Sequence, residues 1–152
     1  MTHNKLTHDK VLSTSCHSTL EDVRAVLVRV DAYLRAADTP TDWIEDVNII
    51  LAEVLSNIAR HGYPDSTGRI DLEILHKRDE LRCCIIDTGH PFDPRLLRQA
   101  PPEPSFLQEG GYGLFLIRTL ARALTYRRIM GCNRLTFWVP VGTRQVVAEM
   151  AG

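Results

Sequence analysis

The feature that most constrains the fold is one amphipathic stretch between residues 42 and 63. Its apolar side chains recur at three- and four-residue spacing, which predicts a single helix with a buried stripe. The stripe comprises Ile44, Val47, Leu51, Val54, Leu55 and Ile58. Asp42 or Thr41 is expected to cap the start of this helix, and Gly62 is expected to end it. The rest of the chain is therefore expected to be organised around this helix.

One flank of the same helix carries polar groups at four-residue spacing. Glu53, Asn57 and His61 place a carboxylate, an amide and an imidazole along one edge. An amide oxygen can ligate a hard cation, and a carboxylate one turn away can accept a proton or orient a water molecule. The alternative is a solvated stripe without chemistry, and the helix taken alone does not decide between the two.

Length and composition indicate one domain over residues 1–152, with a core from about 5 to 140. Hydrophobic residues make up 44% of the 152 and charged residues 24%, and the formal net charge is -1. This balance gives no reason to expect nucleic acid or an anionic membrane as a partner. Apolar runs are shorter than the roughly 20 residues of a membrane helix, so we expect a cytoplasmic location.

The four cysteines lack the paired spacing of a structural zinc site. Cys16 and Cys132 stand alone, while Cys83 and Cys84 are adjacent in an apolar run. A reducing cytoplasm argues against disulfides. We interpret the cysteines as packing residues.

Alternation and turn residues predict five strands and two further helices. The strands are expected over residues 5–13, 69–76, 81–86, 125–130 and 134–139, the last two being joined by a turn at 131–133. The helices are expected over 20–37, with Ser18 opening a capping box, and over 114–124.

A short polar motif follows the strand expected at 81–86. Asp87 supplies an acceptor at the end of that strand, and Gly89 leaves the backbone open to the close approach of a ligand. Triplets of this kind also form ordinary turns. The motif therefore gains weight only in combination with others.

A long loop and a glycine cluster come next. Residues 95–109 are rich in proline and polar side chains, and a loop of this length in a compact chain is often a lid. Gly110, Gly111 and Gly113 then open into the helix expected at 114–124. Backbone N–H groups at such a helix N-terminus can hold an anion such as phosphate, and a flexible hinge is the alternative.

Three features follow one another along the chain: Glu53 and Asn57 on a helix, Asp87 and Gly89 after a strand, and Gly111 and Gly113 before a helix. In this order they resemble the asparagine box and two glycine boxes of the GHKL ATP-binding superfamily of gyrase, chaperone, histidine kinase and mismatch-repair ATPases. The runs NIARHGY (57–63), DTGHPFDP (87–94), GYGLFLI (111–117) and NRLTF (133–137) are similar to the bacterial anti-sigma-factor serine/threonine kinases in particular. The resemblance implies an α+β Bergerat fold: a two-layer sandwich of a mixed, mostly antiparallel sheet with helices on one face.

The resemblance also implies a role for individual residues. By that similarity Asn57 binds the Mg²⁺ that bridges the phosphates of ATP or ADP, and Glu53 is the general base. Asp87 accepts from the adenine amino group, and Gly89 lets the base lie against the backbone. The other nucleotide contacts that it implies are Arg60, His61, Phe92, Gly110, Gly111, Tyr112, Gly113, Leu114 and Thr136.

The function implied is that of an ATP-dependent serine/threonine protein kinase that is also an anti-sigma factor. It would phosphorylate a STAS-type anti-anti-sigma partner, sequester a sigma factor and work as a homodimer. The alternative is a regulator that binds nucleotide and a partner without kinase activity. Glu53 favours the kinase, because a pure binder needs no base beside the metal ligand.

Overall fold

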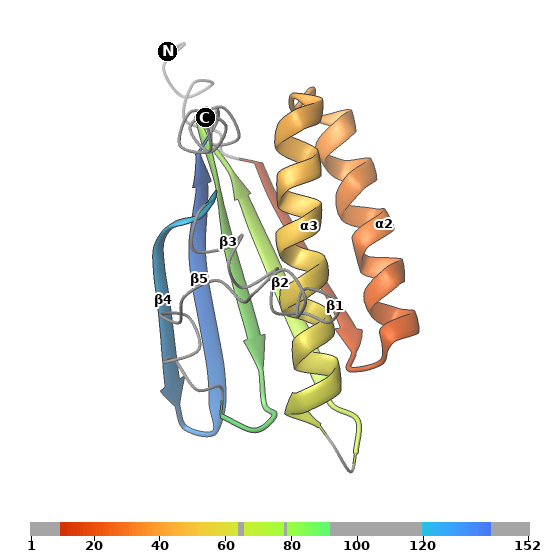
Figure 1. Ribbon diagram of the computed structural model, residues 1–152, viewed down its shortest axis with the longest axis vertical. Coiled ribbons are helices and arrows are strands. Elements are labelled where there is room, and N and C mark those ends of the chain that lie inside the picture. Colours follow the sequence, from red (N-terminus) through yellow and green to blue (C-terminus); the bar gives the residue numbers. More distant parts are fainter. Residues whose placement is uncertain (1–9, 64–65, 78, 92–119, 141–152) are drawn as a thin grey trace, which may run out of the picture.

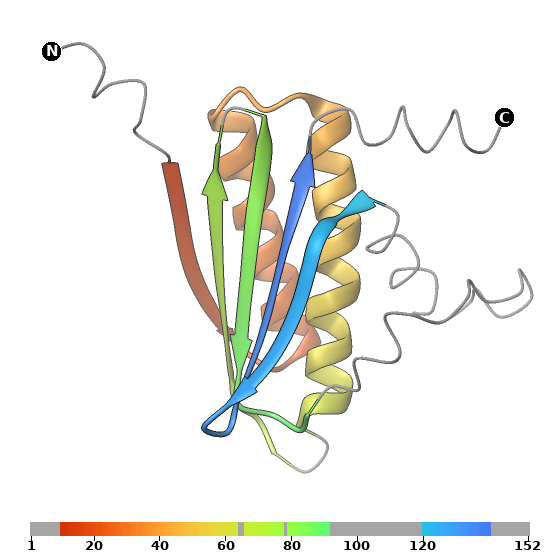
Figure 2. The ribbon, with the colours of Figure 1, turned by 90° about the vertical axis from the view of Figure 1, so that its left-hand side faces the viewer.

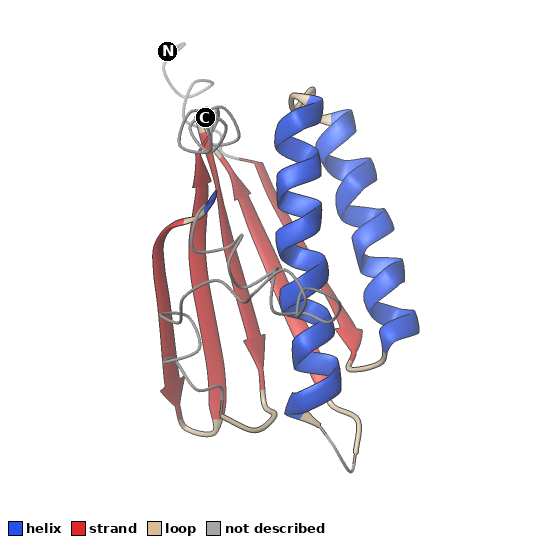
Figure 3. Ribbon diagram, in the orientation of Figure 1, coloured by secondary structure: helices blue, strands red, loops and turns tan. Residues whose placement is uncertain are grey.

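The computed structural model describes residues 10–63, 66–77, 79–91 and 120–140, and it places helices α2 and α3 on one face of a five-stranded sheet (Figure 1). The strands are β1 (Lys10–His17), β2 (Arg69–His76), β3 (Glu80–Asp87), β4 (Arg122–Ile129) and β5 (Cys132–Pro140), in the spatial order β1-β2-β3-β5-β4. Sheet and helices form two separate layers (Figure 3). The predicted α+β sandwich is confirmed, and the described strands pair only in antiparallel fashion rather than in a mixture.

The core lies between the sheet and the two helices, α2 (Leu20–Ala36) and α3 (Thr41–Asn57). The predicted stripe of α3 is buried as far as Leu55, and Ile58 is partly buried against the same core. Trp43 Nε1 donates to Val139 O at 3.0 Å, which joins the start of α3 to the end of β5. Burial of this stripe therefore fixes the orientation of α3 over the sheet.

Both helices are capped by residues other than the predicted ones. Thr19, not Ser18, caps α2, and its Oγ1 accepts from Asp22 N at 3.1 Å. The hydroxyl of Ser18 is engaged elsewhere, because it accepts from Gly68 N at 2.9 Å. Pro40 occupies the cap position of α3. The proposed caps Thr41 and Asp42 are wrong for this reason, since both already lie within the first turn.

The end of α3 also corrects the prediction. The α-helix stops at Asn57, and Ile58–Gly62 form a π-helical turn, η1. In such a turn each N–H bonds to the carbonyl five residues back, so side chains four apart no longer lie above one another. His61 is therefore not aligned with Glu53 and Asn57 as an uninterrupted α-helix would place it.

The first strand extends beyond its predicted end at Ser13. It runs from Lys10 to His17, and residues 1–9 are outside the described part of the chain. Every residue of β1 pairs with β2, from Lys10 opposite His76 to His17 opposite Arg69. The length and register of β2 thus determine where β1 lies, and local alternation alone does not contain that information.

The hairpin of β4 and β5 differs from the prediction in its turn. Met130 and Gly131 have φ angles of 52° and 80°, the backbone of a two-residue turn that matches the twist of the strands. The predicted turn at 131–133 is therefore wrong, and Cys132 and Asn133 belong to β5. This shift places Asn133 directly opposite Asp87 on β3.

The start of β4 overturns part of a predicted helix. Residues 122–124 were expected to end the helix at 114–124, but they belong to the strand. Arg122 pairs with Trp138 and forms an ion pair with Glu80, and Ala123 has a φ of 55° within a register irregularity. Pairing with β5 outweighs the helical propensity of this stretch.

The end of α3 is joined to the loop after β3 by a close backbone contact. His90 N donates to Gly62 O at 2.8 Å. A Cβ on Gly89 would lie 2.5 Å from that oxygen and 2.9 Å from Gly62 Cα, closer than real atoms approach. Gly89 is therefore required by the packing of two backbone segments, which is a different reason from the ligand contact expected from sequence.

We predict that alanine is tolerated on one side of this contact and not on the other. Gly89→Ala should destabilise the fold by about 1–3 kcal/mol, because the obstacle is backbone and cannot rotate away. Gly62→Ala is the matched control: its Cβ meets Ile58, Asp87 and Gly89 atoms at 3.6 to 3.9 Å, ordinary contact distances, so we expect a change within about 0.5 kcal/mol. Urea unfolding measures both, and equal losses would contradict the proposed packing.

Candidate functional site

The centre of the candidate site is a buried carboxylate at the end of β3. Asp87 is 5% exposed and lies on the face of the sheet that the helices cover. Its Oδ1 accepts from Gly89 N at 2.8 Å and from Asn133 Nδ2 at 3.0 Å. Oδ2 receives no hydrogen bond from any residue in the described ranges. One oxygen is thus anchored, and the other can accept from a ligand.

Asn133, which the sequence interpretation placed in a turn, is the most connected side chain of the site. Besides Asp87, its Nδ2 donates to Gly89 O at 3.2 Å and to His90 O at 2.9 Å. Its Oδ1 accepts from Tyr126 Oη at 2.6 Å and from Arg128 Nη1 at 2.8 Å. At 4% exposure, Asn133 is as buried as the carboxylate that it holds.

Arg128 joins the β4–β5 hairpin to the loop after β3. Its Nη1 donates to Gly89 O at 2.9 Å in addition to the Asn133 amide. The end of α3, the loop after β3 and this hairpin lie at the same end of the molecule (Figure 2). Three elements far apart in the sequence therefore meet around Asp87.

Glu53 and Asn57 occupy the last turns of α3, as predicted. Asn57 Nδ2 lies 3.4 Å from Glu53 Oε1, a long hydrogen bond. Burial raises the pKa of the Glu53 carboxyl above its ordinary value of 4.5, and the bond from Asn57 and the charge of Arg60 act in the opposite direction. The pKa of the Glu53 carboxyl therefore lies closer to neutral pH than that of a free glutamate, and a pKa near the operating pH suits a general base.

The remaining predicted residues on the helix end are exposed. Arg60 and His61 lie in η1 with solvent-exposed side chains, and Arg60 is close enough to influence Glu53 electrostatically. Gly62 connects this turn to Asp87, since a Cβ there would lie 3.9 Å from Asp87 Oδ1. The end of α3 and the carboxylate of β3 are therefore neighbours.

Thr136 does not join this group. It lies three residues along β5 from Asn133, and alternation puts its side chain on the opposite face of the sheet. There its Oγ1 lies 3.8 Å from Cys84 Sγ, within the limit for a hydrogen bond to sulfur. Thr136 therefore lies on the face of the sheet away from Asp87, and the β5 residue that faces Asp87 is Asn133.

Six of the predicted nucleotide contacts lie outside the described residues. They are Phe92, Gly110, Gly111, Tyr112, Gly113 and Leu114, together with the lid expected at 95–109. Their assignment remains a prediction from the sequence.

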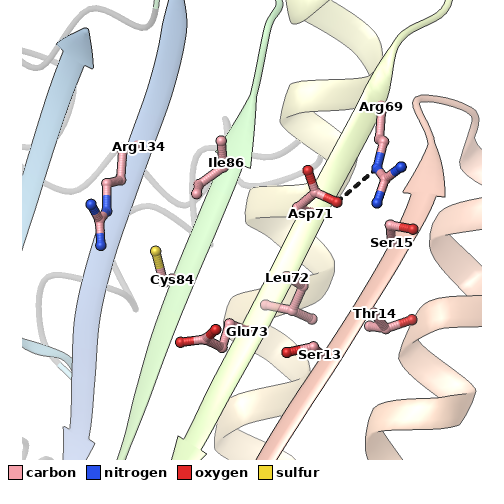
Figure 4. A pocket seen from close by; sticks show the side chains of 10 residues that line it. All are labelled: Ser13, Thr14, Ser15, Arg69, Asp71, Leu72, Glu73, Cys84, Ile86 and Arg134. Carbon is pink, nitrogen blue, oxygen red and sulfur yellow. Dashed lines mark hydrogen bonds and ion pairs between the residues drawn. The ribbon is translucent and has the colours of Figure 1, made fainter.

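A hollow of about 390 Å³ is found on the face of the sheet opposite to α2 and α3 (Figure 4). Arg69 and Asp71 form an ion pair at its edge, and Glu73, Cys84 and Arg134 also line it. Of the residues predicted to bind nucleotide, those within the described ranges do not line this hollow. Because its charges are of both signs and partly paired, we do not regard it as the nucleotide site.

Among the described residues, the cysteines pack and do not form a metal centre. All four are free, and burial raises the pKa of the Cys83 thiol to about 12. In the described ranges there is no cluster of three or more histidine, cysteine, aspartate or glutamate side chains that could hold a metal ion. In the same ranges, no helix has the length and hydrophobicity needed to cross a membrane.

The sequence resembles protein kinases over part of its length. It is 36% identical over 84 residues to the serine-protein kinase RsbW of Oceanobacillus iheyensis, covering 51% of this chain and 53% of that protein. It is 37% identical over 87 residues to the serine/threonine-protein kinase BtrW of Bordetella bronchiseptica, covering 55% of this chain and 61% of that protein. RsbW of Staphylococcus aureus is 29% identical over 119 residues, 73% of this chain and 75% of that protein. The chain thus spans about half the length of the first of these relatives.

Solved structures share the fold at low sequence identity. The crystal structure of the RsbU and RsbW domains of Rv1364c from Mycobacterium tuberculosis superposes with a TM-score of 0.60 and 16% identity, covering 86% of this chain and 32% of that one. The histidine kinase domain of Erythrobacter litoralis EL346 superposes with a TM-score of 0.55 and 18% identity, covering 84% of this chain and 65% of that one.

The broadest match is to a family of nucleotide-binding domains. Residues 16–138 match the model of the histidine kinase-like ATPase domain, and this range contains all of α2, α3, β2, β3 and β4, most of β5 and the end of β1. It also contains Glu53, Asn57, Asp87 and Asn133. The chain therefore belongs to the histidine kinase-like ATPase domain family, which confirms the resemblance found in its sequence and implies that its ligand is ATP.

Proposed function

We propose that this chain is an ATP-dependent serine/threonine protein kinase that acts as an anti-sigma factor. It would transfer phosphate to a STAS-type anti-anti-sigma protein and otherwise hold a sigma factor, working as a homodimer in the cytoplasm. The observation that carries the proposal is the pairing of Glu53 with Asn57 at the end of α3, next to the loop that follows Asp87. The similarity to RsbW and BtrW, which are named as a serine-protein kinase and a serine/threonine-protein kinase, supports the kinase activity.

The donor set at the end of α3 fits a magnesium ion. The Asn57 amide nitrogen is engaged with Glu53, which leaves Oδ1 of that amide to a hard cation. Magnesium is commonly held by one or two protein oxygens together with phosphates and water, so a larger cluster of ligands is not required. Bound there, Mg²⁺ would neutralise charge on the phosphates during transfer.

Asp87 would recognise the base of the nucleotide. No described residue donates to its Oδ2, which is therefore an acceptor open to a ligand, and the amino group of adenine is a donor. A ligand that supplies a donor to this oxygen gains a hydrogen bond to a carboxylate, which is stronger than one between neutral groups.

Glu53 would act as the general base. It would take the proton from the serine or threonine hydroxyl of the partner as that oxygen forms a bond to the γ-phosphorus and the bond to the ADP oxygen breaks. Burial raises its pKa, which makes the carboxylate a better proton acceptor than a free glutamate. Asn57 orients it through the hydrogen bond between their side chains.

We predict that Glu53→Gln separates transfer from binding. Removing the base should lower the rate of phosphoryl transfer by a factor of about 10²–10⁴ and leave ATP affinity near that of the wild type. The assay uses radiolabelled ATP and purified STAS-domain proteins from the same organism, with calorimetry for ATP affinity. Glu45→Gln, exposed on the same helix, is the matched control and should transfer normally.

The outcomes separate the two candidate functions. Transfer by the wild type that Glu53→Gln abolishes supports the kinase. ATP binding without transfer to any STAS protein would instead favour the nucleotide-dependent regulator without kinase activity. Loss of ATP binding in Glu53→Gln would show that Glu53 has a structural role, contrary to the proposal.

The raised pKa of Glu53 also predicts a pH-dependent effect on stability. Below the ordinary value of 4.5 the carboxyl is protonated in both the folded and the unfolded chain. As pH rises through the higher folded-state pKa, the folded chain resists ionisation more than the unfolded chain does, so the wild type loses stability. Glu53→Gln cannot ionise and avoids this loss.

The stability difference between Glu53→Gln and the wild type should therefore shift in favour of the variant between about pH 4 and about pH 8. Urea unfolding at a series of pH values measures it. A difference that is independent of pH, or that shifts in favour of the wild type, would show that burial does not raise this pKa.

A further inference from the structure

The amide of Asn133 can lie in only one orientation. Its two N–H bonds are shared among three acceptors, Asp87 Oδ1, Gly89 O and His90 O. Its oxygen accepts from Tyr126 and Arg128. Rotating the amide by half a turn would set its oxygen against a carboxylate and two carbonyls, and its N–H groups against Arg128, which has no acceptor. Arg128 therefore defines which end of Asn133 faces Asp87, and the Tyr126 hydroxyl adds a second donor to the same amide oxygen.

The orientation of Asn133 in turn defines the orientation of the Asp87 carboxylate. Oδ1 is drawn toward Asn133 Nδ2 and Gly89 N, at 3.0 and 2.8 Å. These bonds fix rotation about the last side-chain torsion, which is otherwise broad for aspartate. Oδ2, which receives no bond from the described residues, is left as an acceptor with a fixed direction.

An acceptor with a fixed direction can distinguish two classes of purine. A 6-amino purine presents a donor to it, whereas a 6-oxo purine presents a carbonyl, and two acceptors facing each other leave both without a partner. A carboxylate that is free to rotate could turn aside from the carbonyl and would distinguish the two less well. Discrimination therefore depends on what holds the carboxylate as well as on the carboxylate itself.

We propose that Asn133, held by Tyr126 and Arg128, is the positioning residue that makes the site selective for 6-amino over 6-oxo purine nucleotides by fixing the orientation of Asp87. This inference rests on the proposed nucleotide site. The inference goes beyond the proposed site because it assigns selectivity to side chains on β4 and β5 that do not themselves contact the base.

The test compares the affinity of the whole chain for ATP and for inosine triphosphate, which carries a carbonyl at position 6, by calorimetry. In Asn133→Ala the ratio of the two affinities should fall by about tenfold, mostly through weaker ATP binding. Tyr126→Phe removes only the hydroxyl that donates to Asn133 and should lower the ratio by about threefold. A ratio of affinities is insensitive to a uniform loss of folded protein.

Arg134→Ala is the matched control, because Arg134 is the next residue on β5 and its exposed side chain lies on the opposite face. Its ratio should equal that of the wild type. If Asn133→Ala does not fold, the decision rests on Tyr126→Phe, and an unchanged ratio in that variant overturns the inference. So does an equal loss of both triphosphates in Asn133→Ala.

The wild type separates this inference from the proposed function. Binding of ATP with clear preference over inosine triphosphate, lost in Asn133→Ala, supports both. Equal binding of the two triphosphates by the wild type overturns the inference and leaves the kinase proposal standing. Failure to bind either one overturns both.

Discussion

The contact between Gly62 and Gly89 is the constraint on which the rest of the site depends. It joins the end of α3, which carries Glu53 and Asn57, to the loop that follows Asp87. Because backbone meets backbone there, the distance between the two segments cannot be adjusted by a side-chain rotation. The π-helical turn η1 ends at Gly62 and so leads directly into this contact. Turns of this kind are frequent at functional sites. Packing of the α3 stripe on the sheet then holds the contact in place.

Around this contact the site divides into two parts of different character. At the helix end, Glu53 and Asn57 are partly exposed, as suits groups that would meet phosphate, metal and a protein hydroxyl. At the strand end, Asp87 and Asn133 are almost fully buried and are joined by a hydrogen-bond network. Because breaking a hydrogen bond of a buried polar group costs free energy, such a network holds its side chains in one arrangement. A fixed arrangement is what selective recognition of a ligand needs.

The sequence predicted the local features of this protein better than the nonlocal ones. Periodicity and motif depend on neighbouring residues, and they predicted the stripe of α3, the strands β2 and β3, and the positions of Glu53, Asn57 and Asp87.

Errors arose where a distant partner decides the structure. β1 follows the register of β2, and Arg122 joins a strand because β5 is beside it. Asn133 was missed for the same reason, because its position opposite Asp87 depends on a two-residue turn. The in-phase pattern of Asn133, Leu135, Phe137 and Val139 was the one local indication of it.

The most direct measurement is calorimetry of ATP binding with and without Mg²⁺, comparing the wild type with Asn57→Ala and Asp87→Ala. If the two parts of the site hold the two ends of one nucleotide, Asp87→Ala should weaken binding in both conditions, because it removes a contact to the base. Asn57→Ala should remove only the gain that Mg²⁺ provides, because its oxygen acts through the metal. An absence of ATP binding in the wild type, or full affinity in Asp87→Ala, would contradict a nucleotide site at this place.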